Sequence, residues 1–359
     1  MRWDNLRLDS SGPDGGFAAP PLIERGAVVR TFDTPGFHGM TFYEIQAKSI
    51  VSRVPEASRM PFRYTINPYR GCQHACKYCF ARNSHTYLDL DSGRDFDSKV
   101  VVKVNAPELL RAKLASPGWD GEHIAMGTNV DCYQRAEGRY RLMRPIISAL
   151  TDAGNPFSIL TKGTLILRDL DLLLAADEVT DVGLNVSAGF VDKSLWRAIE
   201  PGTPDPERRL EACATLTDSW LRCGVLMGPI VPFLSDSPAQ LEAAVRQIAA
   251  SGAAHVMPIV LHLRPGAREW YLRWLREAHP DLVPRYAELY GRGSYARKDY
   301  LARIHAQVTE LAERHGVGRS SNPRRGNRGH AGRRAAAPAV SATPPVPRVP
   351  PVHEQLTLL

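Results

Sequence analysis

The sequence predicts an α/β fold: a partial (β/α)6 barrel of the TIM-like kind, followed by a C-terminal helical extension and a disordered tail. Between residues 61 and 262, six short β-rich apolar runs alternate with longer helical patterns, as parallel βαβ units require. No glycine-rich phosphate turn follows the first run, which argues against a doubly wound sheet. No apolar run approaches the roughly 18 residues that span a bilayer, so no membrane partner is expected.

Each element is bounded by a change of pattern or by a turn residue. The expected strands are residues 63–67, 123–127, 156–161, 182–187, 224–231 and 255–263. The expected helices between them are residues 139–153, 169–176, 206–222 and 238–250.

Shifts of composition divide the chain into five parts. Residues 1–50 form an N-terminal extension, 51–264 the barrel, 265–318 the helical extension, 319–350 an Arg/Pro/Ala-rich disordered linker, and 351–359 a candidate peptide motif. Aromatic residues recur at helical spacing in the helical extension. They either pack this extension onto the barrel or form a platform on which nucleic-acid bases stack.

Charge and cysteine content narrow the class of protein. The chain has 359 residues and a formal net charge of +7, and its last 41 residues hold seven arginines and one glutamate. Most of the net charge therefore belongs to the tail, and it is no evidence for a nucleic-acid-binding fold. The charged N-terminus lacks the apolar centre of an export signal, so we expect a cytoplasmic protein, in which close cysteine spacing indicates metal or redox chemistry.

Three cysteines carry the strongest chemical signal. Cys72, Cys76 and Cys79 are spaced C-x3-C-x2-C directly after the first expected strand. Thiolates are soft ligands suited to iron–sulfur clusters, and three of them leave one iron of a 4Fe-4S cluster open. An open iron accepts a bidentate small molecule such as S-adenosylmethionine, through its amino and carboxylate groups.

Two alternatives compete with the cluster. A structural zinc ion could use the three thiolates with His74 as a fourth ligand, which would make this a zinc-stabilised nucleic-acid-binding protein without catalysis. No second C-x2-C, however, follows at zinc-ribbon spacing. The cysteines could also be plain structural residues. That description fits Cys213 and Cys223, which we expect to be buried as small apolar side chains.

The loop resembles the motif of the radical S-adenosylmethionine (radical SAM) superfamily, C-x3-C-x-aromatic-C, with Tyr78 as the aromatic residue. Together with ILTKG, RLEA and GPIVP further along, it resembles the spore photoproduct lyase branch and its relatives from non-sporulating organisms. The resemblance covers about residues 60–263. It implies reductive cleavage of S-adenosylmethionine, hydrogen abstraction from a substrate, and a low-potential electron donor of the flavodoxin or ferredoxin type. The substrate that it suggests is a nucleic acid, as a DNA photolesion or base; the same radical chemistry on a peptide or small molecule is the alternative.

In that family the loop after the second strand contacts the cofactor. Here Gly127 allows a close backbone approach, and Thr128 can form hydrogen bonds. Spore photoproduct lyases carry a hydrogen-donating cysteine where this chain has Thr128. We therefore take Asp131, Cys132 and Tyr133 as the catalytic candidates of this loop; ordinary helix capping is the alternative. Phe80 also departs from the family, which has a tyrosine there.

Strand ends supply the remaining cofactor candidates. Lys162, in ILTKG, matches a family lysine that meets the cofactor carboxylate. Asn185 and Ser187 end the fourth expected strand and are candidates for the ribose hydroxyls, or simply polar residues at a strand end. Glu200, Arg209, Pro229, Pro232 and Asp236 also match the family, but helix capping and proline-bounded strand ends explain them without chemistry.

The tail suggests two binding partners. Its Arg/Gly/Asn stretch at 319–334 either attracts phosphates in a salt-dependent way or only solvates the chain. The last residues, EQLTLL, resemble the peptide that binds the bacterial sliding clamp. In such a peptide Leu356, Leu358 and Leu359 would enter a hydrophobic cleft and Gln355 would bind at its edge.

Overall fold

The computed structural model describes residues 26–58 and 60–318. Its main sheet has seven strands in the order β11-β10-β9-β8-β7-β4-β3. All neighbouring strands from β4 to β11 are parallel, and β3 pairs antiparallel with β4 at one edge. The strands are β3 (Val51–Arg53), β4 (Tyr64–Ile66), β7 (Ile124–Met126), β8 (Phe157–Thr161), β9 (Val182–Ser187), β10 (Cys223–Ile230) and β11 (Val256–Val260).

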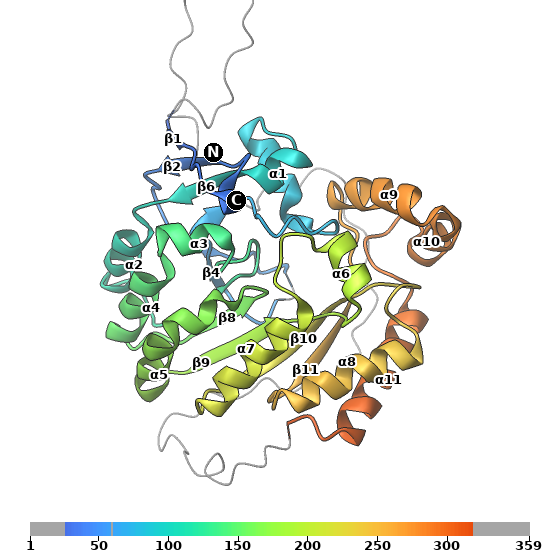
Figure 1. Cartoon of the computed structure of the whole chain (residues 1–359). Helices are drawn as coiled ribbons and strands as arrows, with labels where there is room; N and C mark the ends of the chain where they lie inside the picture. Colours follow the sequence, from blue (N-terminus) through green and yellow to red (C-terminus); the bar gives the residue numbers. More distant parts are fainter. Residues whose placement is uncertain (1–25, 59, 319–359) are drawn as a thin grey trace, which may run out of the picture.

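A helix follows each of the six parallel strands, so the (β/α)6 prediction is confirmed (Figure 1). All six predicted strands and all four predicted helices are present; the first of those helices is split between α3 and α4. The helices are α2 (Ala106–Leu114), α3 (Arg135–Tyr140), α4 (Met143–Asp152), α5 (Leu170–Val179), α7 (Pro206–Asp218), α8 (Pro238–Ala250) and α11 (Lys298–Arg314). In β8, buried residues alternate with half-buried ones, as expected for a strand with helices on one face and the open barrel interior on the other.

A second, four-stranded sheet, absent from the sequence predictions, lies beside the barrel in the order β1-β2-β6-β5. Its strands are β1 (Val28–Arg30), β2 (Thr41–Ile45), β5 (Tyr69–Arg70) and β6 (Lys99–Lys103). The buried side chain of Phe42 packs against the rings of Phe32, Phe37 and Tyr140. Because Tyr140 belongs to α3, this aromatic cluster joins the N-terminal segment to the barrel.

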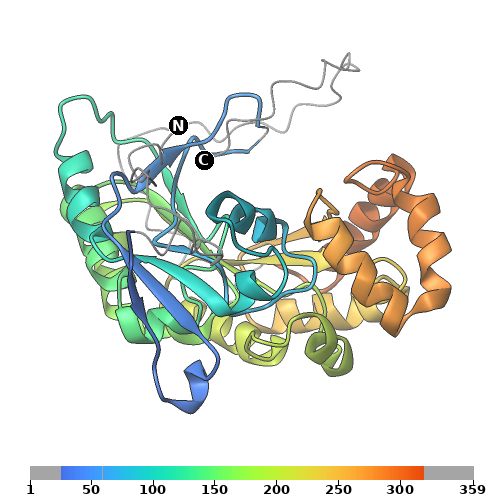
Figure 2. The same ribbon diagram turned by 90° about the horizontal axis from the view of Figure 1, so that it is seen from above.

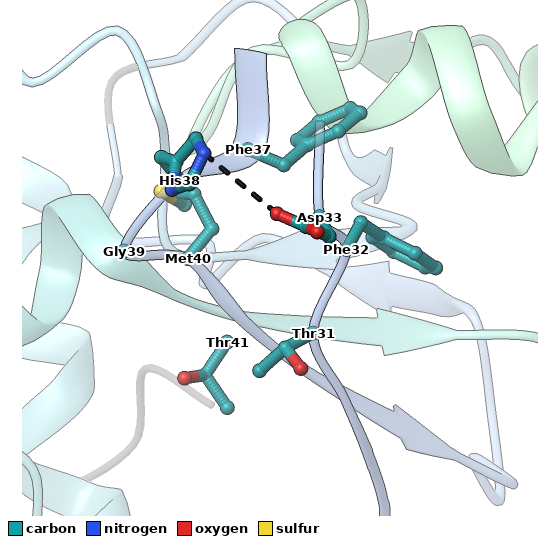
Figure 3. Close-up of a pocket in the computed structure, with 8 residues that line it drawn as sticks. All are labelled: Thr31, Phe32, Asp33, Phe37, His38, Gly39, Met40 and Thr41. Atoms are coloured by element: carbon teal, nitrogen blue, oxygen red, sulfur yellow. Dashed lines mark ion pairs between the residues drawn. The ribbon is translucent and has the colours of Figure 1, made fainter. Parts of the chain in front are cut away.

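The turn η3 (Pro35–Phe37) between β1 and β2 borders a shallow hollow (Figure 3). Asp33 and His38 face one another across it at 3.8 Å, and both side chains are exposed, so solvent screens their attraction. Arg135 of α3 donates a hydrogen bond to the Gly36 carbonyl at 3.0 Å. The hollow is a feature of this turn, and the turn docks on α3.

The helical extension divides into two parts (Figures 1 and 2). Helix α9 (Ala267–Ala278) contacts η4 (Phe80–Leu88), which precedes α1 (Arg94–Ser98), and α10 (Val283–Tyr290) packs on α9. Helix α11 instead packs on β11 and α8 as the sixth barrel helix. A short helix, α6 (Lys193–Ile199), precedes α7. The short 3-10 helices are η5 (Thr164–Asp169) and η6 (Pro280–Leu282).

Most aromatic residues of the extension pack inside the fold. Tyr271, Tyr286, Tyr290 and Tyr300 are buried, and the Tyr271 and Tyr286 hydroxyls lie 2.9 Å apart. The packing interpretation is therefore confirmed for these four residues. Tyr295 differs, because 52% of it is exposed.

Candidate functional site

The cysteine loop begins where the two sheets meet. It follows β4 and β5, and β5 is held by its antiparallel pairing with β6. Gly71 has φ +85°, and a Cβ there would lie 2.6 Å from the Lys99 carbonyl oxygen, so a glycine is required. The Cys72 amide donates to the Phe96 carbonyl at 3.0 Å. The small sheet thus fixes the position at which the three-cysteine segment starts.

The three thiols occupy one protected turn. Cys72 and Cys76 are buried and Cys79 is half-buried. Burial raises the pKa of Cys72, and the neighbouring Asp131, Cys79 and Cys76 raise it further. Burial likewise raises the pKa of Cys76 to about 12. Thiolates gathered here would repel one another unless a cation shares the site, which is the condition that an iron–sulfur cluster satisfies.

The described residues contain no preformed metal site. Among residues 26–58 and 60–318, no three Cys, His, Asp or Glu side chains are grouped closely enough to hold a metal ion. The choice of a cluster over zinc therefore rests on the cysteine motif. Burial lowers the pKa of His74 to about 4, and its Nδ1 lies 3.4 Å from an Asp131 carboxylate oxygen. His74 therefore contacts Asp131 as a neutral ring.

Gln134, buried in the loop after β7, holds the cysteine loop from the side. Its amide nitrogen donates to the Gly71 carbonyl at 3.0 Å, and its amide oxygen accepts from the Gln73 amide at 3.1 Å. On the other side, the His74 carbonyl accepts from the Gly202 amide at 3.1 Å, and the Lys77 amide donates to Ile199 at 2.9 Å. The cysteine loop is therefore tied to segments that follow β7 and β9.

Asp131 organises the strand ends around this loop. One carboxylate oxygen accepts from the Tyr133 amide at 2.8 Å and from the Thr161 hydroxyl at 2.6 Å, and the other accepts from the Lys162 amide at 2.6 Å. Asp131 thus contacts the cysteine loop through His74, and its catalytic role stays a prediction. Its contacts are those of a residue that positions the backbone leading to Lys162.

A buried network of charged and polar groups lies next to Cys76. The Lys162 ammonium donates to the Ser187 hydroxyl at 2.7 Å and lies 4.0 Å from Glu200. Glu200 also accepts hydrogen bonds from the Tyr78 hydroxyl and, at 2.5 Å, from the Arg209 guanidinium. The network thus joins three predicted cofactor residues, Tyr78, Lys162 and Ser187, through one carboxylate.

Sequence reasoning missed the importance of Glu200 and Arg209. It explained both by local capping, but Glu200 is fully buried and Arg209 is 1% exposed. Burial alone would raise the pKa of the Glu200 carboxyl, yet Arg209 and Lys162 outweigh burial and hold that pKa below its usual range. Glu200 is therefore an anion inside the site. The match of Glu200 and Arg209 to the family motif was the sequence signal that could have identified them as site residues.

Asn185 lies lower in the barrel than this network. Its side-chain oxygen accepts from the His255 Nε2 at 2.9 Å, a bond that passes over Gly224 of β10. The structure does not join Asn185 to Lys162 and Ser187 by any hydrogen bond among the described residues. Its assignment to a ribose hydroxyl stays a prediction.

The end of β7 approaches β8 very closely. Gly127 has φ +75°, and a Cβ at this position would overlap the Leu160 carbonyl oxygen. Thr128 and Asn129 follow it and are half-buried. The close approach confirms that a glycine is needed here, and the contact of this loop with the cofactor stays a prediction.

Among the described residues, neither the Cys132 thiol nor the Tyr133 hydroxyl forms a hydrogen bond to the cysteine loop. Cys132 is fully buried in the main core, where burial raises its pKa well above the usual value. Tyr133 is 1% exposed, and its hydroxyl donates to Asp169 at 3.1 Å. Their roles as hydrogen donors stay predictions that would require a path through packed side chains.

Two exposed aromatic residues flank the site. Phe80 follows Cys79, is 43% exposed, and stacks with the Arg264 guanidinium 5.2 Å from its ring centre. The exposed ring of Tyr295 packs edge-on against His262, with centroids 4.6 Å apart. Both Arg264 and His262 follow β11, so the carboxyl end of the barrel presents π surfaces and positive charge together.

Comparison with known proteins agrees with the motif. The family model of the Radical SAM superfamily matches residues 66–247, which contain the cysteine loop and most of the barrel. This chain belongs to the radical SAM superfamily. An uncharacterized protein of Mycobacterium tuberculosis is 45% identical over 323 residues, covering 90% of this chain and 95% of the relative. An uncharacterized protein of Methanocaldococcus jannaschii is 34% identical over 195 residues, covering 54% of this radical SAM chain and 69% of the relative.

Solved structures extend the likeness of fold beyond the matched segment. A point mutant of spore photoproduct lyase aligns with a TM-score of 0.58 and 14% identity, covering 87% of this chain and 86% of that one. Spore photoproduct lyase complexed with dinucleoside spore photoproduct gives a TM-score of 0.57 and 14% identity, with 77% and 80% covered. The radical SAM chain thus has the fold of spore photoproduct lyase. None of its described helices has the length and apolar character needed to cross a membrane.

Proposed function

We propose that this chain binds a 4Fe-4S cluster through Cys72, Cys76 and Cys79 and uses it to cleave S-adenosylmethionine. The carrying observation is the set of three protected thiols on one loop beside a buried cation–carboxylate network. The bound cluster and cofactor would supply one-electron cleavage to methionine and a 5′-deoxyadenosyl radical that abstracts hydrogen from a substrate, with the electron coming from a flavodoxin or ferredoxin type of donor.

The protein's own residues would bind and orient the cofactor. Lys162 presents an ammonium that can pair with a carboxylate, and its bond to Ser187 fixes the direction of that ammonium. Tyr78 is held by Glu200 beside Cys76, so its ring is fixed at the wall of the site.

Anaerobic reconstitution tests the cofactor part of the proposal. The full chain, supplied with iron and sulfide, is expected to bind about four irons per chain and to form 5′-deoxyadenosine with dithionite and S-adenosylmethionine. Cys72→Ala, Cys76→Ala and Cys79→Ala should each lose both properties. Cys213→Ala is the matched control and should keep both, because Cys213 lies in the core away from this loop. A colourless protein that binds one zinc ion would overturn the proposal.

A nucleic acid is the substrate class that we favour. Exposed Phe80 and Tyr295, with the exposed Arg264 stacked on Phe80, offer base stacking and phosphate attraction. The fold-related spore photoproduct lyase was solved with a dinucleoside photoproduct, which supports the same class. Formation of 5′-deoxyadenosine should rise when ultraviolet-damaged DNA is added. Absence of DNA binding and of any stimulation would favour the alternative, a peptide or small-molecule substrate.

A further inference from the structure

Arg82 is a buried cation on the outer side of the cysteine loop. Its side chain is fully buried, and its Nε and Nη2 donate to the Cys76 carbonyl at 3.1 and 2.9 Å. Nη2 also binds Asp97 at 2.7 Å, and Nη1 donates to the Gly93 carbonyl at 2.8 Å. One guanidinium therefore fixes the backbone between two of the three cysteines.

Arginine suits this position because its planar fork donates several hydrogen bonds while both of its faces remain free to stack.

Two aromatic rings enclose the guanidinium. Its carbon lies 5.2 Å from the centre of the Phe96 ring and 4.9 Å from that of Trp270. The Lys77 ammonium also lies over the Trp270 indole, 5.7 Å from the ring centre. The indole packs tightly on the loop before α1, since a Cβ added at Gly93 would lie 2.5 Å from the Trp270 ring. Trp270 therefore contacts the side chains of Lys77 and Arg82, which precede and follow Cys79 in the chain.

Trp270 belongs to α9, beyond the segment 66–247 that defines the family match. At the start of the same helix, Gly266 lies against Asn83 of η4, where an added Cβ would come within 3.1 Å of the Asn83 side chain. The capping contact from Glu269 to the Gly266 amide, at 2.6 Å, holds this end of α9 in place. The contact between α9 and η4 is thus a built interface that extends from Gly266 to Trp270.

We propose that the C-terminal extension is part of the cofactor site: Trp270 is a positioning residue that clamps Arg82, and through Arg82 it holds the cysteine loop closed around its metal cluster. This inference rests on the proposed function only for the identity of the metal group. Without the indole, one face of Arg82 becomes hydrated, its hold on the Cys76 carbonyl weakens, and the cysteines become accessible.

Cysteine alkylation of the cluster-free full chain tests the clamp directly. Iodoacetamide labelling, mapped by mass spectrometry, should be several-fold faster at Cys79 in Trp270→Ala than in the unaltered chain, and close to the unaltered rate in Trp270→Phe, which restores an aromatic face. Trp274→Ala is the matched control on the same helix and should leave the rate unchanged, because Trp274 packs on Tyr271 and His279 instead. Equal Cys79 rates in Trp270→Ala and the unaltered chain would overturn the proposal.

Cys213 reports whether each variant keeps its fold, since it is fully buried in the barrel core. If Trp270→Ala also exposes Cys213, that variant has lost its fold, and Arg82→Lys is labelled in its place. Arg82→Lys removes the two hydrogen bonds to the Cys76 carbonyl and leaves α9 unchanged. Cys79 labelling in Arg82→Lys as slow as in the unaltered chain would refute the clamp. On reconstituted protein, the visible absorbance should bleach several-fold faster in air for Trp270→Ala than for Trp274→Ala. If the unaltered chain binds no cluster, the proposed function is wrong. The alkylation rates at Cys79 would still test the contact between Trp270 and Arg82 independently.

Discussion

The buried pair between Glu200 and Arg209 gives a prediction whose size follows from burial. Glu200→Gln removes the carboxylate charge that pairs with the Arg209 guanidinium, and the Arg209 side chain is only 1% exposed. Breaking a buried ion pair by removing one partner costs about 3–5 kcal/mol, because the remaining charge stays desolvated. The glutamine oxygen can still accept from Tyr78, which keeps one hydrogen bond worth about 1 kcal/mol. We therefore expect a loss near 3 kcal/mol, roughly a 100-fold fall in the ratio of folded to unfolded chains.

Urea denaturation of the cluster-free protein, followed by circular dichroism, measures this loss. Glu207→Gln is the matched control, since its ion pair with Lys193 at 2.8 Å is exposed and screened. The double variant Glu200→Gln/Arg209→Met removes the stranded cation as well and should regain at least half of the lost stability. If Glu200→Gln lowers the free energy of unfolding no more than Glu207→Gln does, the reasoning about this buried pair is wrong.

Three further predictions address other parts of the molecule. Gly127→Ala should destabilise the fold by about 2–5 kcal/mol, from its positive φ together with the clash against Leu160, and should abolish binding of S-adenosylmethionine by equilibrium dialysis. Gly121→Ala, with a similar φ and no atom within 4 Å, should cost only about 1–2 kcal/mol and bind normally. Phe42→Ala should cost about 3–5 kcal/mol in thermal or urea unfolding, and a loss below about 1 kcal/mol would mean that the N-terminal sheet is not integral to the fold. A peptide of residues 351–359 should bind purified bacterial sliding clamp in a fluorescence assay and lose that binding with Leu358→Ala; this segment lies outside the described residues, and equal binding by both peptides would remove the clamp as a partner.

The barrel was predictable because its signal is local. Parallel strands buried on one face by helices leave short apolar runs separated by helical patterns, and these persist in any single sequence. The small sheet was not predictable in the same way. Its strands β5 and β6 are separated by the whole cysteine loop and η4, and β5 has two residues, too few for any periodicity.

The sequence by itself determined the cofactor chemistry that we propose. Cys72, Cys76 and Cys79 lie within eight residues, so their spacing by itself predicts that they serve as ligands of one cluster. The carboxyl ends of parallel strands meet at one edge of a barrel, and for this reason Lys162 and Ser187 could also be expected near the loop.

Only the tertiary structure decided which residues support that loop. Arg82 and Trp270 are 188 positions apart and Tyr78 and Glu200 are 122 apart, so their contacts depend on how the chain returns to the loop after several strands. Burial also depends on the complete fold: Glu200 and Cys132 are both fully buried, but Glu200 is paired with Arg209 in the site and Cys132 lies among apolar core side chains. Exclusion of solvent from a side chain depends on the whole folded molecule. The sequence predicts it only where the hydrophobic periodicity of a single helix or strand is sufficient.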